Sequence, residues 1–150
     1  MNIRQATTAD FTELVEMFKD LIKTVYHSNQ LKDDIFFHGA VMDWFRSGKD
    51  IVIAEKDDEI AGFTLAYIQD LGYINPYYYG DIAYIKPHFR KTRAAYLLYN
   101  NVVNYAKQLG LEVEARAFVG NGNKNSVDKI QSKFGTPEFI HFKTNHIKEQ

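Results

Sequence analysis

One segment of the sequence, DIAYIKPHFRKTRAA over residues 81–95, constrains the fold more than any other. A strand-like run ends at Pro87, and a helical pattern follows from about residue 93 to 109. A helix N-terminus presents unpaired backbone N–H groups and a partial positive charge, so it binds phosphate groups. Small residues at Ala94 and Ala95 let an anion approach that backbone. Four cationic side chains surround the turn, namely Lys86, Arg90, Lys91 and Arg93. The segment predicts an anion site, and the alternative is a solvated cationic turn.

The chain has 150 residues, 45% of them hydrophobic and 25% charged, which predicts one globular domain over residues 1–150. A formal net charge of -1 gives no reason to expect a nucleic acid or anionic membrane partner. There are no cysteines, which excludes disulfides and thiolate metal sites and suits a reducing cytosol. We find no apolar run of signal-peptide or transmembrane length. We therefore expect a cytoplasmic protein that does not bind membranes.

Hydrophobic periodicity predicts alternating helices and strands. Helices are expected over residues 11–25, 36–45, 93–109 and 124–134, and strands over 1–6, 51–54, 60–68, 79–85, 111–119 and 139–142. Thr7 and Asp10 have the spacing of a capping box, and Asp57-Asp58 is expected to form a turn. This order predicts an α/β (α+β) fold with a central mixed, twisted sheet flanked by about four helices.

The segment 81–95 resembles the acetyl-CoA-binding segment of GNAT acyltransferases, in which a strand ending V-x-P precedes the pattern Q/R-x-x-G-x-G/A. Ile85-Lys86-Pro87 matches the strand end, Arg90 the first motif position and Ala95 the last, whereas Arg93 stands at the middle glycine. Residues 3–18, 51–63 and 123–135 are similar to other parts of the family pattern, so the resemblance covers nearly the whole chain.

The resemblance implies acetyl-CoA as cosubstrate. Backbone N–H groups of the turn and helix start would hold the pyrophosphate, assisted by the Arg90 and Lys91 side chains. The edge of the preceding strand would pair with the pantetheine arm, and a backbone N–H near Ile85 would polarise the thioester carbonyl. A late asparagine would touch the pantetheine, or else serve only the loop structure. The cofactor-binding residues implied in this way are Ala83, Tyr84, Ile85, Arg90, Lys91, Thr92, Arg93, Ala94, Ala95, Asn123 and Asn125.

The resemblance also implies catalytic positions on the acceptor side. Attack on a thioester needs a neutral amine, and so a group that takes a proton. Family positions that often carry such a group correspond to Asp81, as base, and Tyr79, as orienter; alternatively, solvent or a turn N–H satisfies Asp81. The family's usual acid, a tyrosine, corresponds to Gln131, or to Ile130 with a one-residue shift. A thiol titrates near ~8.5 and leaves without much help.

His27 and His38 flank a loop similar to the family's acceptor-side rim, which makes them substrate-binding candidates. The histidine spacing predicts no metal site. The expected activity is acetyl transfer to a primary amine of a small molecule or a protein. The alternative is a catalytically weak GNAT-like fold that serves as a CoA-binding or protein-interaction module. The sequence leaves open whether the protein is a monomer or a homodimer.

Overall fold

The structure, a computed structural model, describes residues 1–26, 31–115, 128 and 132. Packing divides the chain into two compact units, Met1–Phe118 and Val119–Gln150. All the helices and strands below belong to the first unit, and the single-domain organisation over residues 1–150 stays a prediction.

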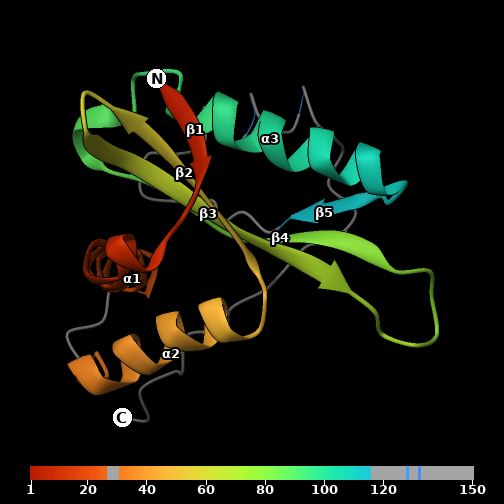
Figure 1. Ribbon diagram of the computed structural model, residues 1–150, viewed down its shortest axis with the longest axis horizontal. Coiled ribbons are helices and arrows are strands. Elements are labelled where there is room, and N and C mark those ends of the chain that lie inside the picture. The colour runs from red at the N-terminus through yellow and green to blue at the C-terminus, as the bar shows by residue number, and fades with distance from the viewer. Residues whose placement is uncertain (27–30, 116–127, 129–131, 133–150) are drawn as a thin grey trace, which may run out of the picture. The chain divides into compact units, whose positions relative to one another are not determined.

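Five strands form one sheet in the order β1-β2-β3-β4-β5 (Figure 1). Their bounds are β1 Asn2–Gln5, β2 Asp50–Lys56, β3 Glu59–Gln69, β4 Tyr77–Ile85 and β5 Val113–Ala115. Neighbouring strands are antiparallel from β1 to β4, whereas β4 and β5 are parallel. A parallel pair needs a crossover connection, and helix α3, Ala94–Leu109, supplies it. The predicted mixed sheet is confirmed.

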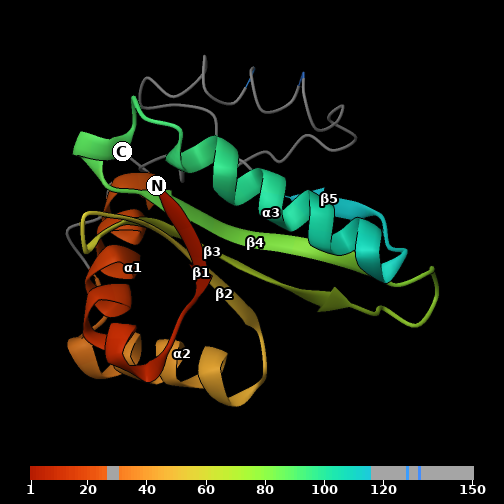
Figure 2. The same cartoon turned by 45° about the horizontal axis from the view of Figure 1, so that its top comes forward.

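Helices cover both faces of the sheet (Figure 2). Helices α1, Phe11–Tyr26, and α2, Asp34–Arg46, lie on one face and α3 lies on the other. The structure thus describes three α-helices. The fourth expected helix, over residues 124–134, lies outside the described residues except for Asp128 and Ser132, which are helical. The strand expected over residues 139–142 also lies outside them. None of the described helices is long and apolar enough to cross a membrane.

Each face of the sheet has its own core. On one side, Leu14 of α1 and Val41 of α2 pack with Phe63 of β3. On the other side, Leu98 and Val102 of α3 pack over the opposite face of the strands. The helical face of α3 therefore fixes the helix against β4, and this places the α3 N-terminus beside the strand that precedes it.

The first helix begins at the predicted capping box, which is confirmed. The Thr7 backbone N–H donates to Asp10 Oδ2 over 2.8 Å, while the Asp10 N–H donates to the Thr7 carbonyl over 2.9 Å. Arg4 of β1 donates two further hydrogen bonds to the Asp10 carboxylate, 2.8 and 2.9 Å long. These bonds from Arg4 hold the pKa of Asp10 below its usual range. Asp10 therefore ties the first strand to the start of α1.

The turn between β2 and β3 consists of Asp57 and Asp58, as expected. Lys56 pairs with Glu59, so the loop has two residues. Both aspartates have positive φ, 51° and 63°. These are the signs of a type I′ hairpin turn, whose twist matches that of the strands.

Candidate active site

A β-bulge in β4 places Asp81. Leu65 of β3 pairs with Ile82 and Ala66 pairs with Gly80, so the strand register skips Asp81, which is the extra residue of the bulge. A bulge of this kind re-aims a side chain and is common beside active sites. The Tyr67 hydroxyl donates to Asp81 Oδ2 over 3.1 Å. Asp81 is thus held by a tyrosine of the neighbouring strand.

Two further aromatic rings of β4 extend the cluster that begins at Tyr67. Tyr79 of β4 is the cross-strand partner of Tyr67, and their rings meet edge to face with centroids 5.6 Å apart. The rings of Tyr77 and Tyr79 also meet edge to face, with centroids 6.2 Å apart. The structure therefore brings together both predicted catalytic residues, Asp81 and Tyr79. Their roles stay predictions.

The pairing along the edge of β4 that faces β5 changes at Gly80. Parallel pairing joins Tyr78 to Val113, Tyr79 to Glu114 and Gly80 to Ala115. Within the described residues, the pairing ends there, and the predicted pantetheine edge, residues 83–85, follows it. Gly62 of β3 lies opposite Ile85, and a Cβ at Gly62 would collide with the Tyr84 backbone oxygen. The backbones of β3 and β4 therefore approach closely beside this edge.

The side chain of Tyr84 belongs to the core. It is buried, and its hydroxyl donates to the carboxylate of Asp20 on α1. Burial first, and then the bond to Asp20, raise the pKa of Tyr84. Because the side chain lies in the core, only the backbone of Tyr84 is available at the pantetheine edge. The resemblance implies backbone pairing of this kind between the strand and an extended ligand.

The predicted phosphate turn is compact. A short 3-10 helix, Pro87–Phe89, follows β4, and the Thr92 hydroxyl donates to the Phe89 carbonyl over 2.6 Å. The same hydroxyl accepts a hydrogen bond from the Ala94 N–H over 3.3 Å, at the first residue of α3. Thr92 thereby joins the turn to the helix start. The first turn of α3, including Ala95, presents N–H groups without intrahelical acceptors.

Arg93 stands at the middle glycine of the family pattern. Its φ is -78° and its ψ is 1°, so the backbone there is not left-handed. A side chain at this position carries no conformational penalty of the kind that favours glycine. The guanidinium lies 5.9 Å from the centroid of the Tyr96 ring. The departure from the pattern is therefore compatible with the observed turn.

The cations of the turn divide into two groups. Lys86 forms an ion pair with Glu13 of α1, so its charge is already matched. Arg90 donates from Nε to the Ile85 carbonyl over 3.1 Å, and its guanidinium also interacts with Tyr84, where it opposes the rise in the pKa of the hydroxyl. Arg90, Lys91 and Arg93 are exposed. These three side chains are the ones that could contact an anion at the α3 N-terminus.

The remaining candidates lie apart or outside the described residues. His38 of α2 packs against Phe11 at the start of α1, with ring centroids 5.6 Å apart. His27, Asn123 and Asn125, like Gln131 and Ile130, are outside the described residues. Among the described residues there is no group of three or more histidine, aspartate or glutamate side chains that could hold a metal ion.

The sequence analysis missed two residues of this site. Tyr67 touches Asp81 and Tyr79, and the Lys49 ammonium lies over the Tyr67 ring, 4.4 Å from its centroid. The only signal for Tyr67 is its place on the strand that pairs with β4. Which tyrosine meets Asp81 depends on the register and on the bulge, and neither can be read from composition.

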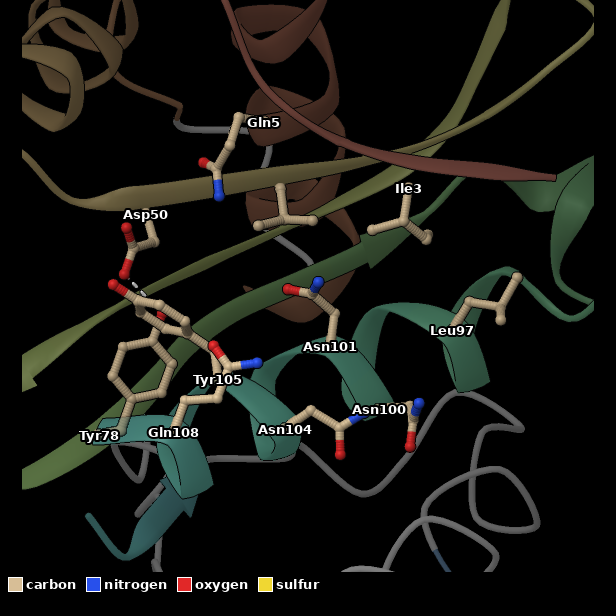
Figure 3. Close-up of a pocket in the computed structure, with 11 residues that line it drawn as sticks. Ile3, Gln5, Asp50, Tyr78, Leu97, Asn100, Asn101, Asn104, Tyr105 and Gln108 are labelled. Atoms are coloured by element: carbon tan, nitrogen blue, oxygen red, sulfur yellow. Dashed lines mark hydrogen bonds between the residues drawn. The ribbon is translucent and has the colours of Figure 1, made fainter. Parts of the chain in front are cut away.

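A separate cavity lies between β1, β2 and α3 (Figure 3). Its volume is about 370 Å³, and Tyr78 donates to Asp50 Oδ2 over 2.6 Å within it. Burial and the bond to Asp50 raise the pKa of Tyr78. Amide side chains of α3, including Asn101 and Gln108, line the other side. None of the predicted site residues that the structure describes lines this cavity.

Comparison with protein families identifies the chain. A model of the acetyltransferase (GNAT) family matches residues 12–135. The chain belongs to the GNAT acetyltransferase family. The match includes the Asp81 bulge, the turn before α3 and α3 itself, and it confirms the resemblance to this family.

Solved GNAT structures share the fold. An aminoglycoside 6′-N-acetyltransferase from Acinetobacter haemolyticus, solved without ligand, is 16% identical, with a TM-score of 0.70 over 100% of both chains. A protein named as a predicted acetyltransferase from Clostridium acetobutylicum, solved with acetyl-CoA, is 18% identical, with a TM-score of 0.73 over 95% of both chains. A possible acetyltransferase from Clostridium difficile 630 is 14% identical, with a TM-score of 0.73 over 97% of both chains. A comparison with curated proteins finds no match.

Proposed function

We propose that the chain transfers an acetyl group from acetyl-CoA to a primary amine of a small molecule or a protein. The observation that carries this proposal is the bulge in β4, which makes Asp81 the extra residue one position beyond the last pair with β5. The same strand then runs to Ile85 and into the turn before α3. The candidate proton acceptor thus lies on the strand that leads into the candidate anion site.

The residues of the turn fit a CoA pyrophosphate. The α3 N-terminus begins at Ala94, which is buried in the core and donates its N–H to Thr92, so the small, partly exposed residue open to an anion at the helix start is Ala95. Arg90 and Lys91 are exposed beside it, and charge-assisted hydrogen bonds from such groups to phosphate are strong. The right-handed backbone at Arg93 keeps the turn free of strain although the family glycine is replaced.

Bound acetyl-CoA supplies the acetyl group in activated form, as a thioester. The amine nitrogen would bond to the acetyl carbon as the carbon–sulfur bond breaks and CoA leaves as its thiolate. The Asp81 carboxylate accepts the proton that the attacking amine gives up, directly or through water. The hydrogen bond from Tyr67 holds that carboxylate in one orientation, and the Tyr79 ring packs against Tyr67. Backbone N–H groups near Ile85 donate to the acyl oxygen, as the family resemblance implies.

Acetyl transfer to a panel of amines tests the proposal. The panel contains an alkylamine, a polyamine, an amino acid, a peptide with a free N-terminus and an aminoglycoside, since one structural neighbour is an aminoglycoside N-acetyltransferase. Release of free thiol and a mass increase of the amine are measured together, with Asp81→Asn as control. The expected result is transfer to at least one amine. CoA binding without transfer to any amine supports the CoA-binding module instead, and the absence of both contradicts both functions.

A further inference from the structure

Lys49 reaches from the end of α2 toward the candidate acceptor side. Its backbone N–H donates to the Trp44 carbonyl over 3.2 Å, which fixes the backbone just after the helix. Its ammonium lies 4.4 Å from the centroid of the Tyr67 ring. A cation within about 6 Å of an aromatic centroid is attracted by the negative ring face. The fold therefore holds a primary alkylammonium on Tyr67.

The position of the Lys49 ammonium is significant because Tyr67 also contacts the two candidate catalytic residues. The Tyr67 hydroxyl is bonded to Asp81, and its ring meets that of Tyr79 edge to face. One tyrosine side chain thus separates the Lys49 ammonium from the carboxylate assigned here as base. Lys49 carries the same functional group, on a similar alkyl chain, as an alkylamine substrate.

The charges around this cluster favour a cation. Asp81 lies on one side, and Glu114 of β5 is the cross-strand partner of Tyr79 on the other. Burial and the nearby Glu114 charge raise the pKa of Tyr77, the next ring along the strand. Lys49 places one positive charge on these rings, whereas Asp81 and Glu114 bring two negative charges to the cluster. An incoming ammonium therefore competes with Lys49 for a surface that suits both.

We propose that the Tyr67 ring face is an ammonium subsite of the acceptor site, and that Lys49 occupies it as an internal competitor which an alkylamine substrate displaces. This inference rests on the proposed function. It names the substrate class: a primary amine on a flexible aliphatic chain. An arylamine, whose charge is delocalised or absent near neutral pH, lacks the group that Lys49 imitates.

Removing the competitor should favour the substrate. Lys49→Met keeps the length and bulk of the side chain but loses its charge. The expected change is a fall of about two- to fivefold in KM for an alkylamine, the range of one exposed cation–π contact, with the effect in KM rather than kcat. Lys49→Arg keeps the cation and should keep the wild-type KM. Lys56→Met removes one charge from exposed Lys56 of the neighbouring hairpin and should change neither constant.

A measurement without turnover tests displacement directly. The Tyr67 ring current should shift the NMR signals of the Lys49 Cε protons upfield, and Lys49→Met assigns those signals by their loss. Butylammonium is then titrated into the wild-type protein. The expected result is a return of the Lys49 signals toward ordinary lysine values as the backbone N–H signals of Tyr79 and Asp81 move.

The outcomes separate this inference from the proposed function. If butylammonium moves the Tyr79 and Asp81 signals while those of Lys49 stay in place, Lys49 is no competitor and the inference is overturned. The inference is also overturned if Lys49→Met leaves KM for the alkylamine unchanged. It is likewise overturned if butylammonium, up to its solubility limit, does not move the Lys49 signals. Acetyl transfer to an amine remains intact in each of these cases. The proposed function fails when no amine of the panel is acetylated, whether or not CoA binds.

Discussion

The Tyr67 hydroxyl on β3 donates a hydrogen bond of 3.1 Å to the Asp81 carboxylate on β4. This bond spans two strands at the position where their register shifts by one residue. Asp81 is the extra residue of the bulge in β4, and this hydrogen bond joins its side chain to the neighbouring strand. The candidate base is therefore positioned by the sheet rather than by a loop.

Asp81→Asn should slow acetyl transfer without weakening CoA binding. Loss of a general base typically reduces the rate by about 10²- to 10⁴-fold. The defect should shrink as pH rises, because the amine then loses its proton without help. Turnover from pH 6 to 10 and CoA affinity are measured on the same samples. Tyr67→Phe and Tyr79→Phe should have smaller effects, since both leave the carboxylate in place. Full activity of Asp81→Asn at neutral pH would rule out Asp81 as the base.

CoA should stabilise the folded protein through the α3 N-terminus. At about 100 times its dissociation constant, a ligand adds roughly 2.7 kcal/mol to the free energy of unfolding. Arg90→Ala and Arg93→Ala should each weaken CoA binding by about 1.5 kcal/mol or more, the value of a hydrogen bond to a charged group. Thermal melts with increasing CoA measure both effects. Lys86→Ala is the contrasting variant, because Glu13 already pairs with Lys86, and it should change CoA affinity less.

Gly62→Ala should destabilise the protein and disturb the β4 edge. The added Cβ would collide with the Tyr84 backbone oxygen and lie 3.0 Å from the Ile85 Cα. Forcing extra atoms into such a place costs typically about 1–3 kcal/mol. Gly39→Ala is the matched control: no atom lies within 4 Å of its added Cβ in the middle of α2, so it should stabilise by about 0.5–1 kcal/mol. Urea unfolding measures both variants, and a neutral Gly62→Ala would contradict the close approach.

Asp10→Asn should lower stability and flatten its dependence on acid pH. The pKa of Asp10 is lowered in the folded state by Arg4, below the ordinary value of 3.8. Its contribution is therefore fully present above the unfolded pKa and is lost as pH falls through the folded pKa. Removing the charge should cost about 1–3 kcal/mol at neutral pH. Urea midpoints from pH 7 to 2 test this, with exposed Asp43→Asn as control. Parallel pH profiles for wild type and Asp10→Asn would contradict it.

The helices and the turn before α3 could be predicted because their signals are local. Leu98 and Val102 follow the helical period, Pro87 ends the strand, and Gly110 adopts a φ of 70° at the end of α3. Each of these constraints acts within one or two turns of the chain. The order of strands and helices, and with it the mixed sheet, follows from such signals.

The environment of Asp81 could not be predicted in the same way. Strict alternation would place Tyr84 on the face opposite Tyr79, yet the bulge at Asp81 brings Tyr84 into the α1 core. The contacts of Tyr67 and Lys49 depend on that shifted register. Arg93 shows the converse: the family glycine suggests an unusual backbone, whereas the observed φ of -78° accepts any side chain.

The turn at Asp57 and Asp58 offers a route to a more robust protein for experiments. Two aspartates hold left-handed conformations there, at 51° and 63°, and side chains at such angles crowd their own carbonyl groups. Asn-Gly is the sequence that most favours this hairpin turn. Replacing this pair with Asn-Gly should therefore raise the thermostability of the protein. In that background, variants weakened at the β4 edge can still be purified and assayed.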